Sequence, residues 1–464
     1  MKKTSYCIIA LAAFGMHVAA KTTVISGNAP SFAGKTIAVR TYSEQVLHEE
    51  EELGQATVAA DGSFKFEIET DHTLQVFIPT DVTKAFLYVE PGESYTISLP
   101  EYRERTIFEK LDPYFAPKDY LATIEGMRRG DFNYQMMEFE DAFDFYTMKH
   151  ITYGSNVDSL RKSVRELRNI FTDLKKPFQE KFKSYRYILL LNMCVGENQP
   201  MQDTIILQLN AIGADYSNPA FWDAFNNVFN EFIVGQIGSE EYELFKRVVV
   251  DNNAKMMMEI LRHRYKITNP LLRELAAIKL VADLTSFQEF SRSQVITMLQ
   301  TLGTVIKDKD NRELLQGLIN KTSVNYIGTP APDFEATDAN GKTFKLSDLK
   351  GKFVYLNFCN SNLEKTGRDL QVLRRFHDSY DGALEIVNIF LYDNKETAKR
   401  MAKPFQGKMR FATVANPDVL RHVYDVKGIP SYLLLDKEGK FLMTKGTEPN
   451  DELRLFLQNT LQLK

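Results

Sequence analysis

The chain has 464 residues, of which 44% are hydrophobic and 25% are charged, and its formal net charge at pH 7 is −4. This length is too great for one compact core and predicts about three domains. The slightly acidic composition argues against an extended basic surface of the kind that binds nucleic acid or acidic membranes.

Residues 1–20 have the pattern of a secretory signal peptide. Two lysines near the start precede an apolar run from Tyr6 to Gly15 that is too short to span a bilayer. The small residues Val18-Ala19-Ala20 then offer a cleavage site, so we expect the mature chain to begin at Lys21. The alternative is an uncleaved anchor. Cleavage predicts a periplasmic or otherwise extracytoplasmic protein with no membrane-spanning segment in the mature chain.

Two cysteines, Cys194 and Cys359, remain after such cleavage. An oxidising compartment permits a bond between them, but two isolated cysteines make no disulfide framework, and we expect free, partly buried thiols. The seven histidines include no pair at ligand spacing, and the chain has no glycine-rich phosphate loop and no Gly-x-Ser-x-Gly elbow. We therefore expect no metal and no cofactor.

An antiparallel β-sandwich is predicted for residues 21–105. The segment from Phe64 to Ile68 follows an Asp61-Gly62 turn and alternates apolar with charged residues, which is typical of a half-buried strand. The acidic run from Glu49 to Glu52 is interpreted as a solvated loop, because it lacks the alternation with glycine of a calcium site. Further candidate strands are Thr36 to Arg40, Leu74 to Ile78, Phe86 to Val89 and Tyr95 to Leu99.

A helical region is predicted for residues 106–325. Apolar residues recur at spacings of three and four from Leu160 to Leu174, and Asn269-Pro270 is a helix start that opens a run to Leu284. The run Met256-Met257-Met258 is interpreted as a mixture of core and surface, since consecutive helical residues point in different directions. No chemistry is predicted for this region.

Residues 326–464 alternate strand and helix patterns, which predicts an α/β domain. The apolar run from Phe353 to Phe358 suits a central buried strand, and a helix from Glu364 to Ser379 follows it. The other expected elements are strands Leu384 to Leu391, Ser431 to Leu435 and Phe441 to Met443 and a terminal helix Asp451 to Leu463.

Three motifs in this last region match a known family. They are the opening segment Gly328 to Phe334, the segment Leu346 to Lys352, and the loop Val426 to Tyr432 with its Ile429-Pro430 pair. On these motifs, residues 328–464 resemble the TlpA-like branch of the thioredoxin-fold family, which is related to the AhpC/TSA group. The resemblance implies a thioredoxin-like fold, thiol-disulfide exchange and a part in cell redox homeostasis. The two preceding regions resemble the N-terminal extensions of exported thioredoxin-like proteins of Bacteroidetes.

The chain departs from the family at the redox site. In the family, a strand that ends in Phe is followed by four residues and then by Cys-x-x-Cys at a helix start. Counting from Phe358 without gaps puts Leu363 and Thr366 at the two cysteine positions, whereas a rival alignment puts Cys359 at the first. The ungapped count also matches the family's apolar helix positions, which here are Leu370, Leu373 and Phe376. We therefore predict a degenerate CxxC site.

Disulfide exchange needs an exposed thiolate, and leucine has no lone pair to replace it. We predict a redox-inactive module that binds an extracytoplasmic peptide or protein partner. The resemblance implies a cis-proline loop in which the backbone of Ile429, before Pro430, pairs with an extended segment. The alternative reading of this loop is that it only holds the fold.

Two further hypotheses stay open, and with them the question of whether the chain is an enzyme. In one, the chain is a thiol-disulfide oxidoreductase or peroxidase that acts through Cys359, although no lysine or histidine is adjacent to lower its pKa and the peroxiredoxin Thr-x-x-Cys pattern is absent. In the other, the thioredoxin-like domain is purely structural, and binding occurs in the sandwich or helical region.

Overall fold

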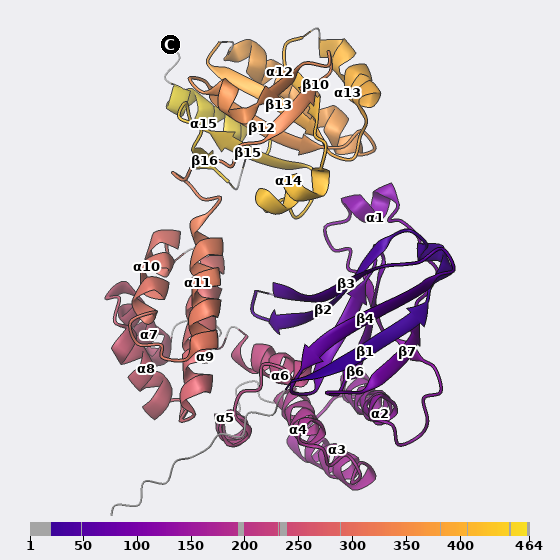
Figure 1. The fold of residues 1–464 in the computed structure, drawn as a ribbon. Coiled ribbons are helices and arrows are strands. Elements are labelled where there is room, and N and C mark those ends of the chain that lie inside the picture. The colour runs from indigo at the N-terminus through magenta and orange to yellow at the C-terminus, as the bar shows by residue number, and fades with distance from the viewer. Residues whose placement is uncertain are drawn as a thin grey trace, which may run out of the picture. The chain divides into compact units, whose positions relative to one another are not determined.

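The computed structural model describes residues 20–47, 49–193, 199–230, 232, 239–287, 289–380, 382–405, 407–444 and 447–461. The predicted signal peptide up to residue 19 and Cys194 lie outside these residues. The multidomain architecture is confirmed: a β-rich N-terminal region, a helical middle and an α/β C-terminal region follow one another (Figure 1). The domain boundaries expected from the sequence stay predictions.

The chain forms two compact units. The described residues of the first lie within Met1–Arg103, Pro117–Asn230 and Tyr265–Leu272. Those of the second lie within Glu104–Ala116, Glu231–Arg264 and Arg273–Lys464. The short segment Glu104–Ala116 therefore belongs with the C-terminal region, although the β-rich region surrounds it in sequence. No described helix is long and apolar enough to cross a membrane.

Two sheets enclose the core of the β-rich region. Their strand orders are β4-β1-β7-β9 and β3-β2-β5-β6-β8, and both sheets contribute buried apolar side chains to one cluster. Most pairs are antiparallel, as predicted, but β1 pairs with β7 and β6 with β8 in parallel. The strands are β1 (Lys21–Asn28), β2 (Thr36–Glu44), β3 (Glu49–Thr57), β4 (Ser63–Thr70), β5 (Leu74–Pro79), β6 (Thr83–Val89), β7 (Ser94–Ser98), β8 (Lys118–Leu121) and β9 (Thr123–Ile124).

The acidic run from Glu49 to Glu52 is part of strand β3, so the prediction of a loop there is wrong. β3 is an edge strand whose acidic side chains face solvent. Arg40 on β2 pairs with Glu50 at 3.1 Å and with Glu52 at 3.3 Å, which offsets the repulsion within the run. A charged edge also discourages pairing with another chain.

The helical region begins with α2 and ends with α11. Helix α9 starts at Pro270, as the Asn269-Pro270 signal predicts, and Met257 is buried while Met256 is exposed. Helix α3 ends at Ile170, short of Leu174, which is nevertheless buried. The helices are α2 (Phe132–Tyr153), α3 (Val157–Ile170), α4 (Pro177–Asn192), α5 (Gln199–Ile212), α6 (Pro219–Phe229), α7 (Glu240–Val250), α8 (Ala254–His263), α9 (Pro270–Asp283), α10 (Arg292–Leu302) and α11 (Lys309–Ser323).

The C-terminal region is a seven-stranded sheet of order β11-β10-β14-β13-β12-β15-β16, with helices around it (Figure 1). The alternation of side chains along β12 divides the core into two clusters, with Phe358 in one and Cys359 in the other. The strands are β10 (Glu335–Asp338), β11 (Thr343–Lys345), β12 (Phe353–Cys359), β13 (Leu384–Phe390), β14 (Arg410–Thr413), β15 (Ser431–Leu435) and β16 (Phe441–Met443). The helices are α12 (Glu364–Ser379), α13 (Lys395–Ala402), α14 (Pro417–Val423) and α15 (Asp451–Leu461).

Candidate functional site

The predicted site residues meet where strand β12 ends. Phe358 near the end of β12 pairs with Ser431 at the start of the antiparallel strand β15. The chain segment before α12 and the loop before β15 therefore emerge at the same edge of the sheet. That loop contains Pro430, and the Ile429–Pro430 peptide bond is cis, as predicted.

Leu363 and Thr366 both lie at the start of helix α12. Leu363 is the N-cap residue, and it offers no side-chain hydrogen bond to the helix. Thr366 is fully buried, and its Oγ1 donates a hydrogen bond of 2.8 Å to the backbone oxygen of Asn360. Neither side chain carries an ionisable or nucleophilic thiol, so this helix start has no group that can attack a disulfide.

The loop between β12 and α12 is fixed by polar contacts. Asn360 Nδ2 donates to the backbone oxygen of Leu391 at 2.6 Å, and its Oδ1 accepts from the backbone N–H of Asn362 at 2.9 Å. Ser361 donates to both oxygens of Asp393, from its hydroxyl at 2.7 Å and from its backbone N–H at 2.8 Å. These bonds hold the start of α12 against the end of strand β13.

Cys359 is the last residue of β12 and not part of the helix start. Its side chain is fully buried, and Sγ donates a weak hydrogen bond of 3.7 Å to the backbone oxygen of Ile389. Burial raises the pKa of the Cys359 thiol well above its usual range, and the charges of Asp393 and Asp369 add to this. The thiolate is therefore strongly disfavoured at neutral pH.

A hydrogen bond to a buried carboxylate ties α12 to the strand that follows the cis-proline loop. Tyr432 on β15 donates its hydroxyl to Oδ2 of Asp369 on α12 at 2.5 Å, and Asp369 is only 6% exposed. Burial and this bond raise the pKa of Tyr432 well above its usual range. Lys365 Nζ lies 3.5 Å from the same carboxylate. Sequence reasoning missed this pair, because its partners lie 63 positions apart and share no local motif.

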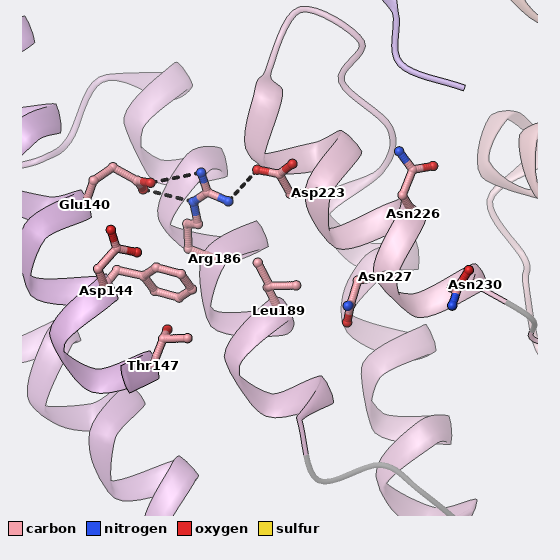
Figure 2. A pocket seen from close by; sticks show the side chains of 10 residues that line it. Glu140, Asp144, Thr147, Arg186, Leu189, Asp223, Asn226, Asn227 and Asn230 are labelled. Atoms are coloured by element: carbon pink, nitrogen blue, oxygen red, sulfur yellow. Dashed lines mark hydrogen bonds and ion pairs between the residues drawn. The ribbon is translucent and has the colours of Figure 1, made fainter. Parts of the chain in front are cut away.

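A second candidate site lies in the first unit, among α2, α4 and α6 (Figure 2). Arg186 on α4 donates two hydrogen bonds of 2.9 Å to Glu140 on α2 and one of 2.5 Å to Asp223 on α6. These side chains line a depression of about 570 Å³, where the buried oxygens Thr147 Oγ1 and Asn226 Oδ1 find no hydrogen-bond partner within the described part of the chain. Glu140 and Asp223 share the single guanidinium of Arg186, so the network chiefly clamps three helices together. Among the described residues, no group of three His, Cys, Asp or Glu side chains is placed to hold a metal ion.

The C-terminal region is similar to proteins of a known family. Residues 327–442 match the model of the AhpC/TSA family. Thiol-disulfide oxidoreductase ResA of Bacillus cereus is 28% identical over 147 residues, which cover 31% of this chain and 84% of that protein. ResA of Bacillus subtilis is 31% identical over 115 residues, which cover 24% of this chain and 63% of that protein. The C-terminal region is thus a thioredoxin-like domain similar to ResA, and the predicted resemblance is confirmed.

Two solved structures from Bacteroides have some likeness to this chain. The thioredoxin domain of a thiol-disulfide oxidoreductase from Bacteroides vulgatus covers 28% of this chain and 97% of its own length, at 21% identity and a TM-score of 0.26. A thioredoxin-like protein from Bacteroides caccae covers 56% of this chain and 94% of its own length, at 14% identity and a TM-score of 0.35.

Loss of the Tyr432 hydroxyl is expected to destabilise the helix that carries the site. Tyr432→Phe leaves the buried Asp369 carboxylate without its short hydrogen bond, which costs about 1–3 kcal/mol. Native-state hydrogen exchange in α12 measures this loss. Tyr392→Phe is the control: it removes a 2.6 Å bond to the exposed Asp418 and a 3.0 Å bond accepted from Arg421, and it should cost less in α12, which neither bond involves. Equal losses in the two variants would contradict the importance of the buried pair.

Loss of Arg186 is expected to destabilise the helical part of the first unit. Arg186→Met leaves Glu140 and Asp223 without their counter-charge, and the melting temperature should fall by about 3–10 °C. The matched control is Lys162→Met, which breaks the exposed Lys162–Glu166 pair of α3 and should change the melting temperature by less than about 2 °C. A melting temperature unchanged by Arg186→Met would mean that the charge network does not clamp these helices.

Proposed function

We propose that this chain is an exported thioredoxin-like protein that binds an extended peptide segment of a partner and does not exchange disulfides. One observation carries the proposal: Leu363 occupies the N-cap of α12, where a thioredoxin-like nucleophile would be activated. The cysteine nearest to it, Cys359, is buried inside the sheet. The scaffold is retained while the attacking sulfur is absent from the helix start.

The binding half of the proposal rests on the cis-proline loop. Ile429 is half-buried, and no hydrogen bond to its backbone N–H or C=O is found among the described residues. An unpaired backbone edge of this kind can accept an extended segment by strand addition, with main-chain hydrogen bonds supplying affinity. The ligand class is therefore a peptide or an extended loop of a protein, and the residues in contact with it are Ile429 and Pro430.

Export is proposed from the signal-like pattern of residues 1–20, which predicts cleavage before Lys21.

The rival hypothesis of an oxidoreductase or peroxidase needs Cys359 to form a thiolate. Burial opposes this, since it raises the pKa of that thiol. The hypothesis that binding lies outside the thioredoxin-like domain would make the depression around Arg186 the place to look.

Thiol reactivity distinguishes an inert site from an active one. Cys359 is expected to react with iodoacetamide at pH 8 only as fast as the domain opens, because its pKa is raised. A thiol introduced by Leu363→Cys should react roughly 100-fold faster, since the N-terminus of α12 lowers its pKa. Peptide-resolved mass spectrometry follows both reactions in the same protein.

Insulin reduction supplies the matching activity measurement. The natural chain is expected to give no turnover, and the Leu363→Cys/Thr366→Cys variant should gain it, because the pair restores Cys-x-x-Cys at the helix start. Turnover by the natural chain that disappears in Cys359→Ala would overturn the redox-inactive assignment and favour the oxidoreductase.

Peptide binding through Ile429 is tested by removing its backbone donor. Peptides selected from a random displayed library are expected to bind the natural chain, and Ile429→Pro should weaken them about tenfold by deleting one N–H. Ile429→Ala is the matched control, because it trims the side chain and keeps that donor. Fluorescence anisotropy measures the affinities. Equal affinities for the natural chain and Ile429→Pro would place binding elsewhere.

A further inference from the structure

A short segment far from the C-terminal region in sequence packs against the loop that carries the proposed binding edge. Residues 104–116 belong to the same compact unit as the thioredoxin-like domain. They contain helix α1 (Ile107–Leu111), which Thr106 and Glu109 cap reciprocally at its start. Asp112 ends the helix, and Pro113 follows it. The capping box gives this five-residue helix a defined shape in spite of its length.

The guanidinium of Arg421 on α14 joins this segment to the cis-proline loop. Nη1 donates to the backbone oxygen of Lys110 at 2.7 Å, and Nη2 donates to the backbone oxygen of Lys427 at 2.9 Å. Nε donates to the backbone oxygen of Val426 at 3.3 Å. Carbonyls in the last turn of a helix lack intrahelical partners and carry partial negative charge, which suits a guanidinium. The Arg421 side chain therefore holds the end of α1 against the cis-proline loop.

Pro113 makes a second contact with the loop, at Gly428, the residue before Ile429. A Cβ atom built on Gly428 would lie 3.2 Å from Cβ and 3.5 Å from Cγ of Pro113, so the absence of a side chain at Gly428 permits the close approach. A peptide that pairs with the backbone of Ile429 needs the space directly beside this glycine. Pro113 stands at the border of that space.

Two large side chains of the segment lie in solvent. Phe108 is 71% exposed and Tyr114 is 91% exposed, so two of its large side chains make little contact. Leu111, at 5% exposure, is the buried apolar residue of α1. A segment with few buried apolar contacts opens more readily than the core it rests on.

We propose that residues 104–116 are an internal ligand of the cis-proline loop, so that a partner peptide binds only when this segment leaves. The inference rests on the proposed function, since it concerns the regulation of the same site. The segment shows what the surface accepts: a helix C-terminus whose free carbonyl meets Arg421, followed by a proline that packs on Gly428.

An engineered disulfide tests the docking without any partner. Pro113→Cys/Gly428→Cys, in the full chain with Cys7 and Cys194 replaced by serine, should form a 113–428 bond under mild oxidation. The 3.2 Å between the two Cβ positions is within a few tenths of an ångström of disulfide geometry. Phe108→Cys/Gly428→Cys is the matched control and should stay unbridged, because among the described residues only Pro113 places atoms within 4 Å of a Cβ built on Gly428. Peptide mapping by mass spectrometry reads the bond. Equal bridging in both pairs, or none in the first, overturns the docking.

The second measurement tests competition. The probe is a fluorescein-labelled synthetic peptide of residues 104–116, added to the full chain. A variant with residues 106–114 replaced by a Gly-Ser linker of equal length should bind it at least tenfold more tightly than the natural chain, since an attached competitor acts at high effective concentration. The oxidised 113–428 variant should bind it more weakly than the same variant after reduction, since only the bond differs between the two forms.

The outcomes separate this inference from the proposed function. Library-selected peptides that bind the oxidised and reduced 113–428 variants equally would overturn the internal ligand and leave peptide binding intact. A 113–428 bond in a protein whose linker variant binds no peptide would overturn peptide binding and, with it, the regulatory role. Linker and natural chains with equal affinity for the probe would also overturn the competition.

Discussion

The candidate site depends on one register. Strand β12 lies inside the sheet, parallel to β13 and antiparallel to β15, and the pairing of Phe358 with Ser431 brings its end beside the cis-proline loop. A shift of one residue would reverse the faces of every β12 side chain and exchange the two cores. The apolar run along β12 makes such a shift costly, because both faces are packed. The positions of Leu363, Cys359 and Pro430 all follow from this pairing.

The same register explains why a cysteine so near the site is buried. Side chains of β12 alternate, so Cys359 points into the cluster that contains Leu370 and Leu373 of α12. A sulfur four residues later in the chain would lie at the helix N-terminus, where the partial charges stabilise a thiolate. In this chain the sulfur of Cys359 lies in an apolar core, and Leu363 occupies the helix start. Polar bonds from Asn360 and Ser361 keep the loop between them fixed.

Local signals were enough to predict much of this domain. Helix α12 begins at Glu364 and ends at Ser379, as its apolar spacing indicates. The cis Ile429–Pro430 bond was implied by the family resemblance of its loop. The failure at Glu49–Glu52 has a physical cause: the cations that pair with Glu50 and Glu52 come from other strands, Arg40 from β2 and Lys84 from β6. The Tyr432–Asp369 bond and the contact of Arg421 with Lys110 were also invisible, since their partners are separated by 63 and 311 positions.

The cis-proline loop is thus constrained unequally on its two sides. After Pro430, Tyr432 is anchored by a buried carboxylate and by Thr447, whose hydroxyl donates to the Tyr432 backbone oxygen at 2.6 Å. Before Ile429, Arg421 donates to two loop carbonyls, and its Nη1 donates both to Tyr392 and to the last turn of helix α1. The loop itself therefore need not move for its edge to become available. Only residues 104–116 must move. Because the backbone of Ile429 is already held in place, the loop loses little conformational entropy when a peptide replaces this segment.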